Sequence, residues 1–404
     1  MINIAVMGYG TIGSGVVKVI DINGESIAKK VGEELNVKYV LDLRSFPGDP
    51  IEEKVVHDVD IILNDPDVKI VVETMGGVKP AYDFVKRALL AGKSVATSNK
   101  ELVAKHGTEL LEIAQEKNIN FLFEASVGGG IPIIRPLNQC LTSDEIYEIT
   151  GILNGTTNYI LTKMAKEGAE FDDVLKQAQA NGYAERNPAA DIEGFDACRK
   201  IAILSSLAYG SMVDFEDIHT EGITNISAVD FKYAAKLGRS IKLFGTSKKK
   251  DGKYFALVAP VMINENHALF AVNDVFNGIL VKGNVVDQVM FYGRGAGSLP
   301  TASAVVADVI EAAKNLNNNM MKPWKAEKLA LSDISEDTKK FFVRISGVAE
   351  DKKAEVEAAF GDAEYITIDG LEEFAIITPV MSEAEYKAAA AKVDGIINMI
   401  RIEE

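Results

Sequence analysis

The stretch PAADIEGFDACRK, residues 188–200, brings three carboxylates, an arginine and a lysine together directly before the uncharged segment IAILSSLAYG. At 100° per residue, Glu193, Asp196 and Lys200 fall within about 60° of one another on one face of a helix. That face continues as aliphatic residues, and no residue from 201 to 213 is charged. A solvated helix would stay polar along its length, so we expect a buried helix whose first turns reach a cavity.

Two structural explanations compete with a functional one for this cluster. Asp191 could be an ordinary helix cap, and Asp196 with Lys200 could form a buried ion pair without a catalytic purpose. A free lysine titrates near ~10.4 and a neighbouring carboxylate favours its charged form, so we expect Lys200 to be protonated at neutral pH. A protonated lysine beside a cavity is suited to donating a proton to a ligand oxygen.

A second candidate site lies near the N-terminus, where AVMGYGTIGSGVVKVI carries Gly8, Gly10 and Gly13 between an apolar strand and a helix. The first glycine permits the tight turn, the second lets the backbone approach a pyrophosphate, and the third lets helix and strand pack closely. A glycine-rich turn without a ligand is the alternative. The α/β pattern that follows favours a dinucleotide cofactor, which Thr11 and Ile12 would also contact.

The sequence leaves the choice between NAD and NADP open. Asp42 ends the second strand, in VKYVLDLR, and lies farther from the glycines than the usual spacing of about 20 residues. Its carboxylate would favour a free ribose diol, whereas the guanidinium of Arg44, two positions on, could hold a 2′-phosphate.

Two further stretches place polar groups where a strand ends. SVATSNKELVAKHG ends a strand at Ser98, so Lys100 lies at the carboxyl edge of a sheet, where ligands bind, although a lysine at a helix start is often only solvated. FLFEASVGGGIPIIRP ends a strand at Glu124 and continues with glycines 128–130. Carbonyls beside one carboxylate suit a hard cation, although a turn between domains would need glycines too.

These residues are positioned by an expected α/β domain over residues 1–130. Its apolar runs alternate with amphipathic segments, which predicts a parallel sheet with helices on both faces, a Rossmann-type doubly wound fold. We expect strands near 2–7, 37–43, 59–63, 69–73, 94–98 and 120–124, and helices near 11–21, 25–35, 80–91 and 101–117.

Beyond residue 130 the pattern predicts an α+β domain over residues 131–298. We expect strands near 145–153, 255–263 and 285–292, helices near 156–167, 171–180 and 191–209, and a helix over 299–318 that returns to the first domain. The turn-rich segment NLNNNMMKPW marks the boundary to a linker over 319–339. Residues 340–404 then read as a complete βαββαβ unit.

The composition of the 404 residues, 47% apolar and 25% charged, indicates a globular protein of two or three domains. Its net charge of −16 would repel a phosphate backbone, so we expect no nucleic-acid partner. Cys140 and Cys198 form no CxxC pair and the four histidines are scattered, which indicates no zinc site and a reducing cytoplasm. Neither a membrane helix of ~18 apolar residues nor a signal peptide is evident.

In order along the chain, GxGxxG, TSNK, EASVGGGIPII, GILNGTTNYIL and ANGYAERNPAADIEGFDACRK resemble homoserine dehydrogenase over residues 1–318. The last motif is the most specific one. It departs from the family pattern at Arg186 and Asn187, where a proline and an aspartate are expected. The resemblance implies reversible reduction of L-aspartate 4-semialdehyde to L-homoserine by NAD(P)H, a step of threonine, methionine and isoleucine biosynthesis.

The resemblance also implies roles for residues of the charged cluster. It makes Lys100 and Lys200 the catalytic lysines and places Asp196 beside the reacting oxygen. Glu185 and Asp191 would bind the ammonium group of the substrate. Lys200 would also contact the substrate. A protonated Lys200 would then donate to the oxygen that becomes an alkoxide as hydride reaches the aldehyde carbon, whereas oxidation would need a base. Which lysine moves the proton stays open.

A cation site and a late cofactor contact are implied in the same way. The ligands of a sodium or potassium ion would be Glu124, Val127, Gly129 and Ile131, the last three through main-chain carbonyls. In YGRGAGSLPTASAVVADV, Gly295 and Gly297 resemble the family's glycine turn that returns to the cofactor. Ser98 and Lys100 would contact the cofactor from the strand end.

The βαββαβ unit of residues 340–404 resembles an ACT domain, an amino-acid-sensing module, in topology more than in motif. SGVAEDKKAEV replaces the acidic-x-Pro-Gly turn expected after its first strand, so a threonine effector and a simple packing or dimerisation module are both open. The family resemblance makes residues 131–298 the substrate-binding and dimerisation domain and implies a homodimer or homotetramer.

Two other functions compete with this reading. Aspartate-semialdehyde dehydrogenase needs a thiolate nucleophile, and neither Cys140 nor Cys198 is convincingly placed for one. A nucleotide-sensing regulator with an ACT-like tail would have no use for Lys100 together with the pair of Asp196 and Lys200.

Overall fold

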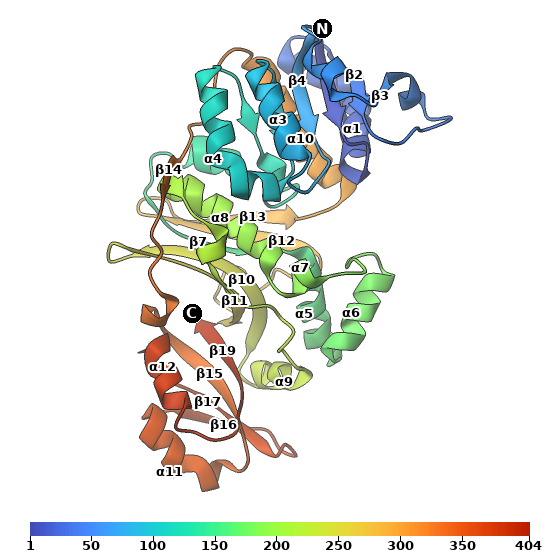
Figure 1. Cartoon of the computed structure of the whole chain (residues 1–404). Coiled ribbons are helices and arrows are strands. Elements are labelled where there is room, and N and C mark those ends of the chain that lie inside the picture. The colour runs from blue at the N-terminus through green and yellow to red at the C-terminus, as the bar shows by residue number, and fades with distance from the viewer.

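The computed structural model describes all 404 residues, which Figure 1 shows as three parts in a row. The first part is a sheet of six strands: β1 (Ile2–Met7), β2 (Leu35–Leu41), β3 (Val55–Val56), β4 (Val68–Glu73), β5 (Ser94–Thr97) and β6 (Phe121–Leu122). Their order in the sheet is β3-β2-β1-β4-β5-β6, and all neighbours pair in parallel. The predicted Rossmann-type parallel sheet is confirmed.

Helices cover both faces of this sheet (Figure 1). They are α1 (Thr11–Val31), α2 (Val59–Leu63), α3 (Ala81–Leu90), α4 (Lys100–Glu116) and α10 (Ser298–Lys314). Helix α10 packs closely along α1, because a Cβ added at Gly15 would lie only 2.9 Å from Ser298 Oγ and 3.0 Å from Ala302 Cβ. The chain therefore returns from its later part to the first sheet through α10.

Two elements of the first part differ from the sequence prediction. Residues 59–63 form helix α2 and not a strand, because the Asp58 side chain accepts a hydrogen bond from the amide of Asp60 and caps a helical turn. Residues 11–31 form one helix and not two, since the helix runs through Gly24 and ends only at Gly32, where φ is 90°.

The second part is built on a mostly antiparallel sheet with helices packed on it. Its long strands are β7 (Ile146–Ile152), β10 (Arg239–Lys250), β11 (Lys253–Asn264), β12 (Phe276–Gly283) and β13 (Asp287–Arg294). Its helices are α5 (Gly155–Glu167), α6 (Phe171–Ala180), α7 (Ala189–Ile192), α8 (Phe195–Tyr209) and α9 (Ala228–Lys236). The sequence did not predict β10 and β12, since lysines and glycines interrupt their apolar pattern.

The third part has the predicted βαββαβ order. Its elements are β15 (Thr338–Ser346), α11 (Ala349–Phe360), β16 (Glu364–Thr367), β17 (Glu373–Ile377), the short β18 (Met381–Ser382), α12 (Glu383–Ala390) and β19 (Ile396–Glu403). Strand β19 pairs in parallel with β11 over Val261–Ile263, so one eleven-stranded sheet runs through the second and third parts. Short strands complete the chain: β8 (Ser211–Met212) pairs with β14 (Lys325–Lys328), and β9 (His219–Thr220) pairs with β11.

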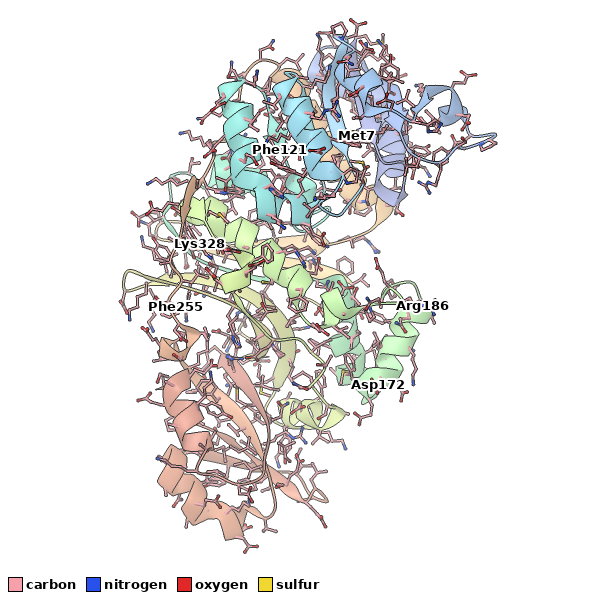
Figure 2. All side chains as sticks on the ribbon, in the orientation of Figure 1. Met7, Phe121, Asp172, Arg186, Phe255 and Lys328 are labelled. Carbon is pink, nitrogen blue, oxygen red and sulfur yellow. The ribbon has the colours of Figure 1, made fainter.

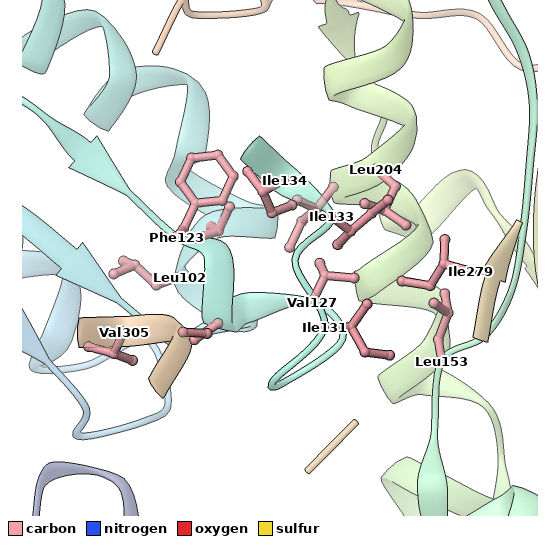
Figure 3. Packing of buried hydrophobic residues seen from close by; sticks show 14 of the residues in the cluster. Leu102, Phe123, Val127, Ile131, Ile133, Ile134, Leu153, Leu204, Ile279 and Val305 are labelled. Carbon is pink, nitrogen blue, oxygen red and sulfur yellow. The ribbon is translucent and has the colours of Figure 1, made fainter. Parts of the chain in front are cut away.

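A continuous cluster of buried apolar side chains connects the three parts. Figure 3 shows its passage from the first part to the second, where Val127 lies near Leu153 and Leu204. Toward the third part, the ring of Tyr233 packs against Phe342 with 5.7 Å between centroids. No helix is both long and apolar enough to cross a membrane.

We expect Phe342→Ala to lower the free energy of unfolding by about 3–5 kcal/mol, because Phe342 is fully buried and its removal leaves a cavity. Urea unfolding followed by circular dichroism measures this change. The matched control is Val348→Ala in the same unit, a position 55% exposed, where we expect a change within about 0.5 kcal/mol. A loss under about 1 kcal/mol for Phe342→Ala would contradict the close packing of this side chain.

Candidate active site

The carboxylate of Asp196, in the first turn of α8, is the centre of a charged cluster between the first two parts. Asp196 is 3% exposed, and Lys100 Nζ and Lys200 Nζ lie 2.5 Å and 2.7 Å from its two oxygens. Lys200 also donates to the carbonyl oxygen of Leu153 at 2.7 Å, and Asn154 Nδ2 donates to Asp196 at 2.9 Å. The structure thus brings the three residues predicted as catalytic to one point.

Parallel strands of the first part carry Lys100 to this point. β4 ends at Glu73 and the neighbouring β5 at Thr97, whose Oγ1 donates to Glu73 Oε2 at 2.6 Å. The side chain of Asn99 then caps α4, and Lys100 is its first residue. Ser98 and Lys100 therefore lie at the carboxyl edge of the sheet, where open α/β sheets bind ligands.

A break between α7 and α8 sets the direction of Asp196. Gly194 has a φ of 86°, so residues 191–209 form two helical segments and not the single helix predicted. Glu193 precedes the break and is exposed. Its predicted place on one face with Asp196 and Lys200 is wrong, because that projection assumes a continuous helix. The rest of α8 is buried over most of its length, as expected.

Asp191, in α7, belongs to the same cluster. Its Oδ1 accepts from Asn154 Nδ2 at 2.7 Å, so that one amide group connects Asp191 with Asp196. Burial, followed by repulsion from Asp196, raises the pKa of Asp191. Glu185 lies elsewhere: its side chain is exposed in the segment between α6 and α7. Of the two predicted ammonium ligands, the structure places only Asp191 in the cluster.

Burial and neighbouring charge shift the pKa values of the two lysines in opposite directions. Burial lowers the pKa of Lys200 below its usual 10.5, although the Asp196 carboxylate opposes the shift. Burial also favours neutral Lys100, but there the attraction of Asp196 outweighs it and the pKa is raised. Burial works against ionised Asp196 as well, yet the two lysines hold its pKa well below its usual range. The Asp196 carboxylate favours charged Lys200 as expected, but burial outweighs this attraction and shifts the pKa of Lys200 downward.

Asn154 is the residue of this cluster that the sequence prediction missed. Its Oδ1 caps α5 by accepting from the amide of Thr157 at 2.8 Å, which leaves Nδ2 to donate to Asp191 and Asp196. The available signal was an asparagine directly before a helix in GILNGTTNYIL. A capping asparagine has two amide hydrogens to spare, but only the fold shows what they contact.

The glycine turn at the start of α1 has the geometry of a phosphate cradle. Gly8 has a φ of 95°, nothing lies within 4 Å of a Cβ added at Gly10, and a Cβ at Gly13 would clash with the carbonyl oxygen of Gly8. Helix α1 begins at Thr11 and Ile12 without a side-chain cap, so its first amides have no side-chain partner. The turn therefore fits the pyrophosphate of a dinucleotide.

The late glycine turn lies against the phosphate turn. Gly297 precedes α10, and the next residue, Ser298, donates to the carbonyl oxygen of Thr11 at 2.7 Å. Gly295 packs directly on Gly129, because a Cβ added at Gly129 would clash with the Gly295 carbonyl. The turn at Gly295 and Gly297 thus connects the first glycine turn with the segment around Gly129.

Asp42 and Arg44 pair with each other at the end of β2. Arg44 Nε and Nη2 each donate to an Asp42 oxygen at 2.9 Å, and the amide of Tyr9 donates to Asp42 at 2.8 Å. These hydrogen bonds, with that of the Arg44 side chain foremost, hold the pKa of Asp42 well below its usual range. The Arg44 side chain is mostly exposed, and of its guanidinium nitrogens only Nε and Nη2 donate hydrogen bonds within the protein.

The turn after β6 has a feature that the sequence did not reveal. The carboxylate of Glu124 accepts hydrogen bonds from the amides of Ile133, Ile134 and Arg135 at 2.6–2.8 Å, so it caps that segment and has little capacity left for a cation. The main-chain carbonyl oxygens predicted as ligands, those of Val127, Gly129 and Ile131, accept no hydrogen bond. A cation at this turn would therefore be held mainly by main-chain carbonyls.

Neither cysteine is suited to nucleophilic catalysis. Cys198 Sγ lies 3.2 Å from the carbonyl oxygen of Phe215, and burial raises its pKa. Cys140 is exposed and belongs to the segment before β7. Since a reactive thiolate is favoured by a lowered pKa, the raised pKa of Cys198 does not support a nucleophilic role.

Comparisons with known proteins identify the family. A family model described as homoserine dehydrogenase matches residues 132–310, and one described as its NAD binding domain matches residues 8–124. A homoserine dehydrogenase of Neisseria gonorrhoeae is 36% identical over 428 residues, which cover 100% of this chain and 98% of that protein. One of Synechocystis sp. is 47% identical over 316 residues, 76% of this chain and 72% of that protein.

Solved structures agree with these matches. A homoserine dehydrogenase from Thiobacillus denitrificans has a TM-score of 0.93 at 34% identity, covering 100% of this chain and 98% of that chain. A hyperthermophilic archaeal homoserine dehydrogenase in complex with NADPH has a TM-score of 0.66 at 29% identity, over 77% of this chain and 97% of that chain. The chain therefore belongs to the homoserine dehydrogenase family, and it is an NAD(P)-dependent oxidoreductase.

Proposed function

We propose that the protein catalyses the reversible reduction of L-aspartate 4-semialdehyde to L-homoserine, a step toward threonine, methionine and isoleucine. The observation that carries this proposal is the buried Asp196 carboxylate, which holds the ammonium groups of Lys100 and Lys200 at one point between the two parts. A carbonyl oxygen becomes negatively charged when its carbon accepts a hydride, and adjacent ammonium groups are suited to stabilise and protonate it.

Lys200 is the proton donor in this proposal. NAD(P)H, when bound, supplies the hydride to the aldehyde carbon. An ammonium group has three N–H donors, and Lys200 uses two of them, toward Leu153 and Asp196. The third remains for the substrate oxygen, and the lowered pKa of Lys200 eases release of the proton. Lys100, whose pKa is raised, stays charged and stabilises the alkoxide. In the reverse direction, neutral Lys200 accepts the hydroxyl proton.

The ammonium group of the substrate would be held by Asp191. One of its oxygens accepts from Asn154, and its other oxygen has no partner in the cluster, so it is available to a cation of the substrate. We also propose Glu185 as a ligand, which requires residues 181–188 to move inward. In Figure 2, the neighbouring Arg186 lies at the outer edge of the second part.

We propose that the cofactor is bound by the turn from Gly8 to Gly13, the strand end at Ser98 and Lys100, and the late turn at Gly295 and Gly297. Asp42 would be a poor partner for a ribose diol, because hydrogen bonds from Arg44 and Tyr9 already occupy both of its oxygens. The exposed guanidinium of Arg44 is suited to a 2′-phosphate. This arrangement favours NADP over NAD.

A monovalent cation, sodium or potassium, is proposed at the turn after β6. Its ligands would be the carbonyl oxygens of Val127, Gly129 and Ile131, which accept no hydrogen bond, together with Glu124 through its main chain. The positive φ values of Gly128 and Gly129, 74° and 56°, let these carbonyls converge in a short turn. The cation would have a structural role beside the late cofactor turn.

The family resemblance also leads us to propose a role for the C-terminal unit and an oligomeric state. Residues 340–404 would be an ACT-like regulatory unit with threonine as the effector, and residues 131–298 would form a homodimer or homotetramer. Strand β13 ends the long sheet and exposes Met290 and Tyr292, so its open edge is available for pairing with a second copy.

Following the absorbance of reduced cofactor with homoserine and NAD or NADP tests the proposed activity. Oxidation should speed up toward alkaline pH, because it needs neutral Lys200, and reduction should slow down there, because it needs the charged form. The lowered pKa of Lys200 places this change below the usual 10.5 of a lysine. No absorbance change with either cofactor would refute the activity, and identical pH profiles in both directions would refute the role of Lys200.

Lys200→Ala should lower kcat by about 10²–10⁴-fold, the usual contribution of a general acid or base, while the Kd of the nucleotide stays nearly unchanged. Steady-state kinetics and fluorescence titration with NADPH measure the two quantities. Lys242→Ala is a matched control, since Lys242 is also buried with its pKa lowered to about 8, but it contacts Val272 and Asn273 outside the cluster. Wild-type turnover in Lys200→Ala would make Lys200 a structural partner only.

Arg44→Ala should weaken NADP binding by about tenfold or more and leave NAD binding unchanged or stronger, because it removes a partner of the 2′-phosphate and frees Asp42 for a ribose diol. The ratio of kcat/KM for NADP and NAD measures the change. Lys54→Ala, in the segment after Arg44, serves as a control for a general loss of positive charge. An equal loss for both cofactors would contradict the assignment.

A further inference from the structure

Arg401 of β19 is a buried charge that connects the C-terminal unit with the second part. It is 1% exposed. On one side its Nε and Nη2 donate to the two oxygens of Glu383, at the start of α12, at 3.0 Å each. On the other side its Nη1 and Nη2 donate to the two oxygens of Glu221 at 2.8 Å and 2.7 Å. A buried guanidinium of this kind needs both carboxylates to offset its loss of hydration.

The sheet explains why Glu221 reaches Arg401. β10 occupies one edge of β11, and β9 and β19 share the other edge. β9 pairs with β11 at Val258, and β19 pairs with it at Val261. Glu221 follows β9 directly, and its amide donates to the carbonyl oxygen of Val258 at 2.7 Å. Its side chain is therefore directed along β11 toward Arg401.

The backbone of the same segment holds the break between α7 and α8. The amide of Ile223 donates to the carbonyl oxygen of Ile192 at 2.8 Å. A Cβ added at Gly222 would clash with Ile192, and one added at Gly194 would lie 3.1 Å from the carbonyl oxygen of Glu221. Residues 221–223 are thus in direct contact with residues 192–194, the turn that separates Asp191 from Asp196.

We propose that Arg401 is a positioning residue for the reaction: through Glu221 it fixes the turn at Gly194 and so the places of Asp191 and Asp196. This inference rests on the proposed function. No residue of the C-terminal unit belongs to the charged cluster itself, so Arg401 acts through Glu221 and the chain that follows it.

The state of Glu221 supports this role. His219 Nε2 lies 2.7 Å from Glu221 Oε1, so the carboxylate has partners from two directions. Burial alone would raise the pKa of Glu221, but the hydrogen bonds of His219 and Arg401 hold it lowered at about 2. Glu221 is therefore negatively charged at any pH near neutrality, so its pairing with the Arg401 guanidinium does not depend on pH there.

A second buried arginine of the same unit provides the comparison. Arg344 of β15 donates to Glu373 within the unit and to Ser227 and Asp230 at the start of α9, at 2.8–3.0 Å. It therefore also ties the unit to the second part, but it does so at α9 and not at the turn before α8. Substitution of either arginine should loosen the contact between the unit and the second part. Only substitution of Arg401 should also displace Asp191.

The test compares Arg401→Met, Arg401→Lys, Glu221→Gln and Arg344→Met in the full-length protein. For Arg401→Met we expect the KM for homoserine to rise and kcat to fall, each by about tenfold, because displacement of a reacting group by about 1 Å is that costly. The KM for NADP should stay within about twofold, since the phosphate turn lies in the first part. Arg401→Lys should recover part of the loss, and Glu221→Gln should reproduce it.

Arg344→Met should lower Tm without changing the KM for homoserine. The double variant Arg401→Met with Glu221→Gln should lose less than the product of the single losses, because both act through one contact. If Arg401→Met does not fold, Glu221→Gln gives the same readout. A lower Tm with an unchanged KM for homoserine in both Arg401→Met and Glu221→Gln would overturn this inference alone. Absence of homoserine turnover in the wild-type protein would overturn the proposed function and this inference with it.

Discussion

The arrangement of this protein depends on one buried carboxylate that needs partners from two parts of the chain. An ionised Asp196 at 3% exposure would be costly without compensation, and it is offset by Lys200 and Asn154 from its own part and by Lys100 from the other. Lys100 and Asp196 can meet only if the sheet of the first part and α8 keep a fixed relation. The apolar residues of Figure 3, among them Val127 and Leu204, keep the two parts in this relative position. The contact between Lys100 and Asp196 therefore depends on the packing between the parts.

The unequal burial of the two lysines gives them different chemistry from the same partner. Lys200 lies within α8 and is buried, so its charged form is penalised and its pKa falls. Lys100 stands at a helix start, more exposed, and the same carboxylate raises its pKa. One ammonium group is thereby suited to exchange a proton and the other to remain a fixed charge, as the proposed hydride transfer to a carbonyl would use them.

Sequence reasoning succeeded where the signal is local. The glycine turn, the strand end before Lys100 and the spacing of Asp196 and Lys200 each follow from adjacent residues and are found in place. It failed where tertiary contacts decide. Gly194 interrupts the helix on which Glu193 was projected, and three amides that follow in the chain occupy the carboxylate of Glu124.

Non-local pairing is also what the pattern of the C-terminal unit could not reveal. Its βαββαβ order can be predicted because each element is a local apolar run. The sequence of β19 does not indicate that it pairs with β11 of the second part. That pairing limits how the unit can influence the site. A ligand of the unit shifts activity only as far as it binds two conformations with different affinity. Conformations that differ at β19, at Arg401 or at α12 would act on the segment leading to Gly194, because the unit meets that segment there. A ligand that leaves these contacts unchanged would have to act on the second part elsewhere, for example through Arg344 at α9.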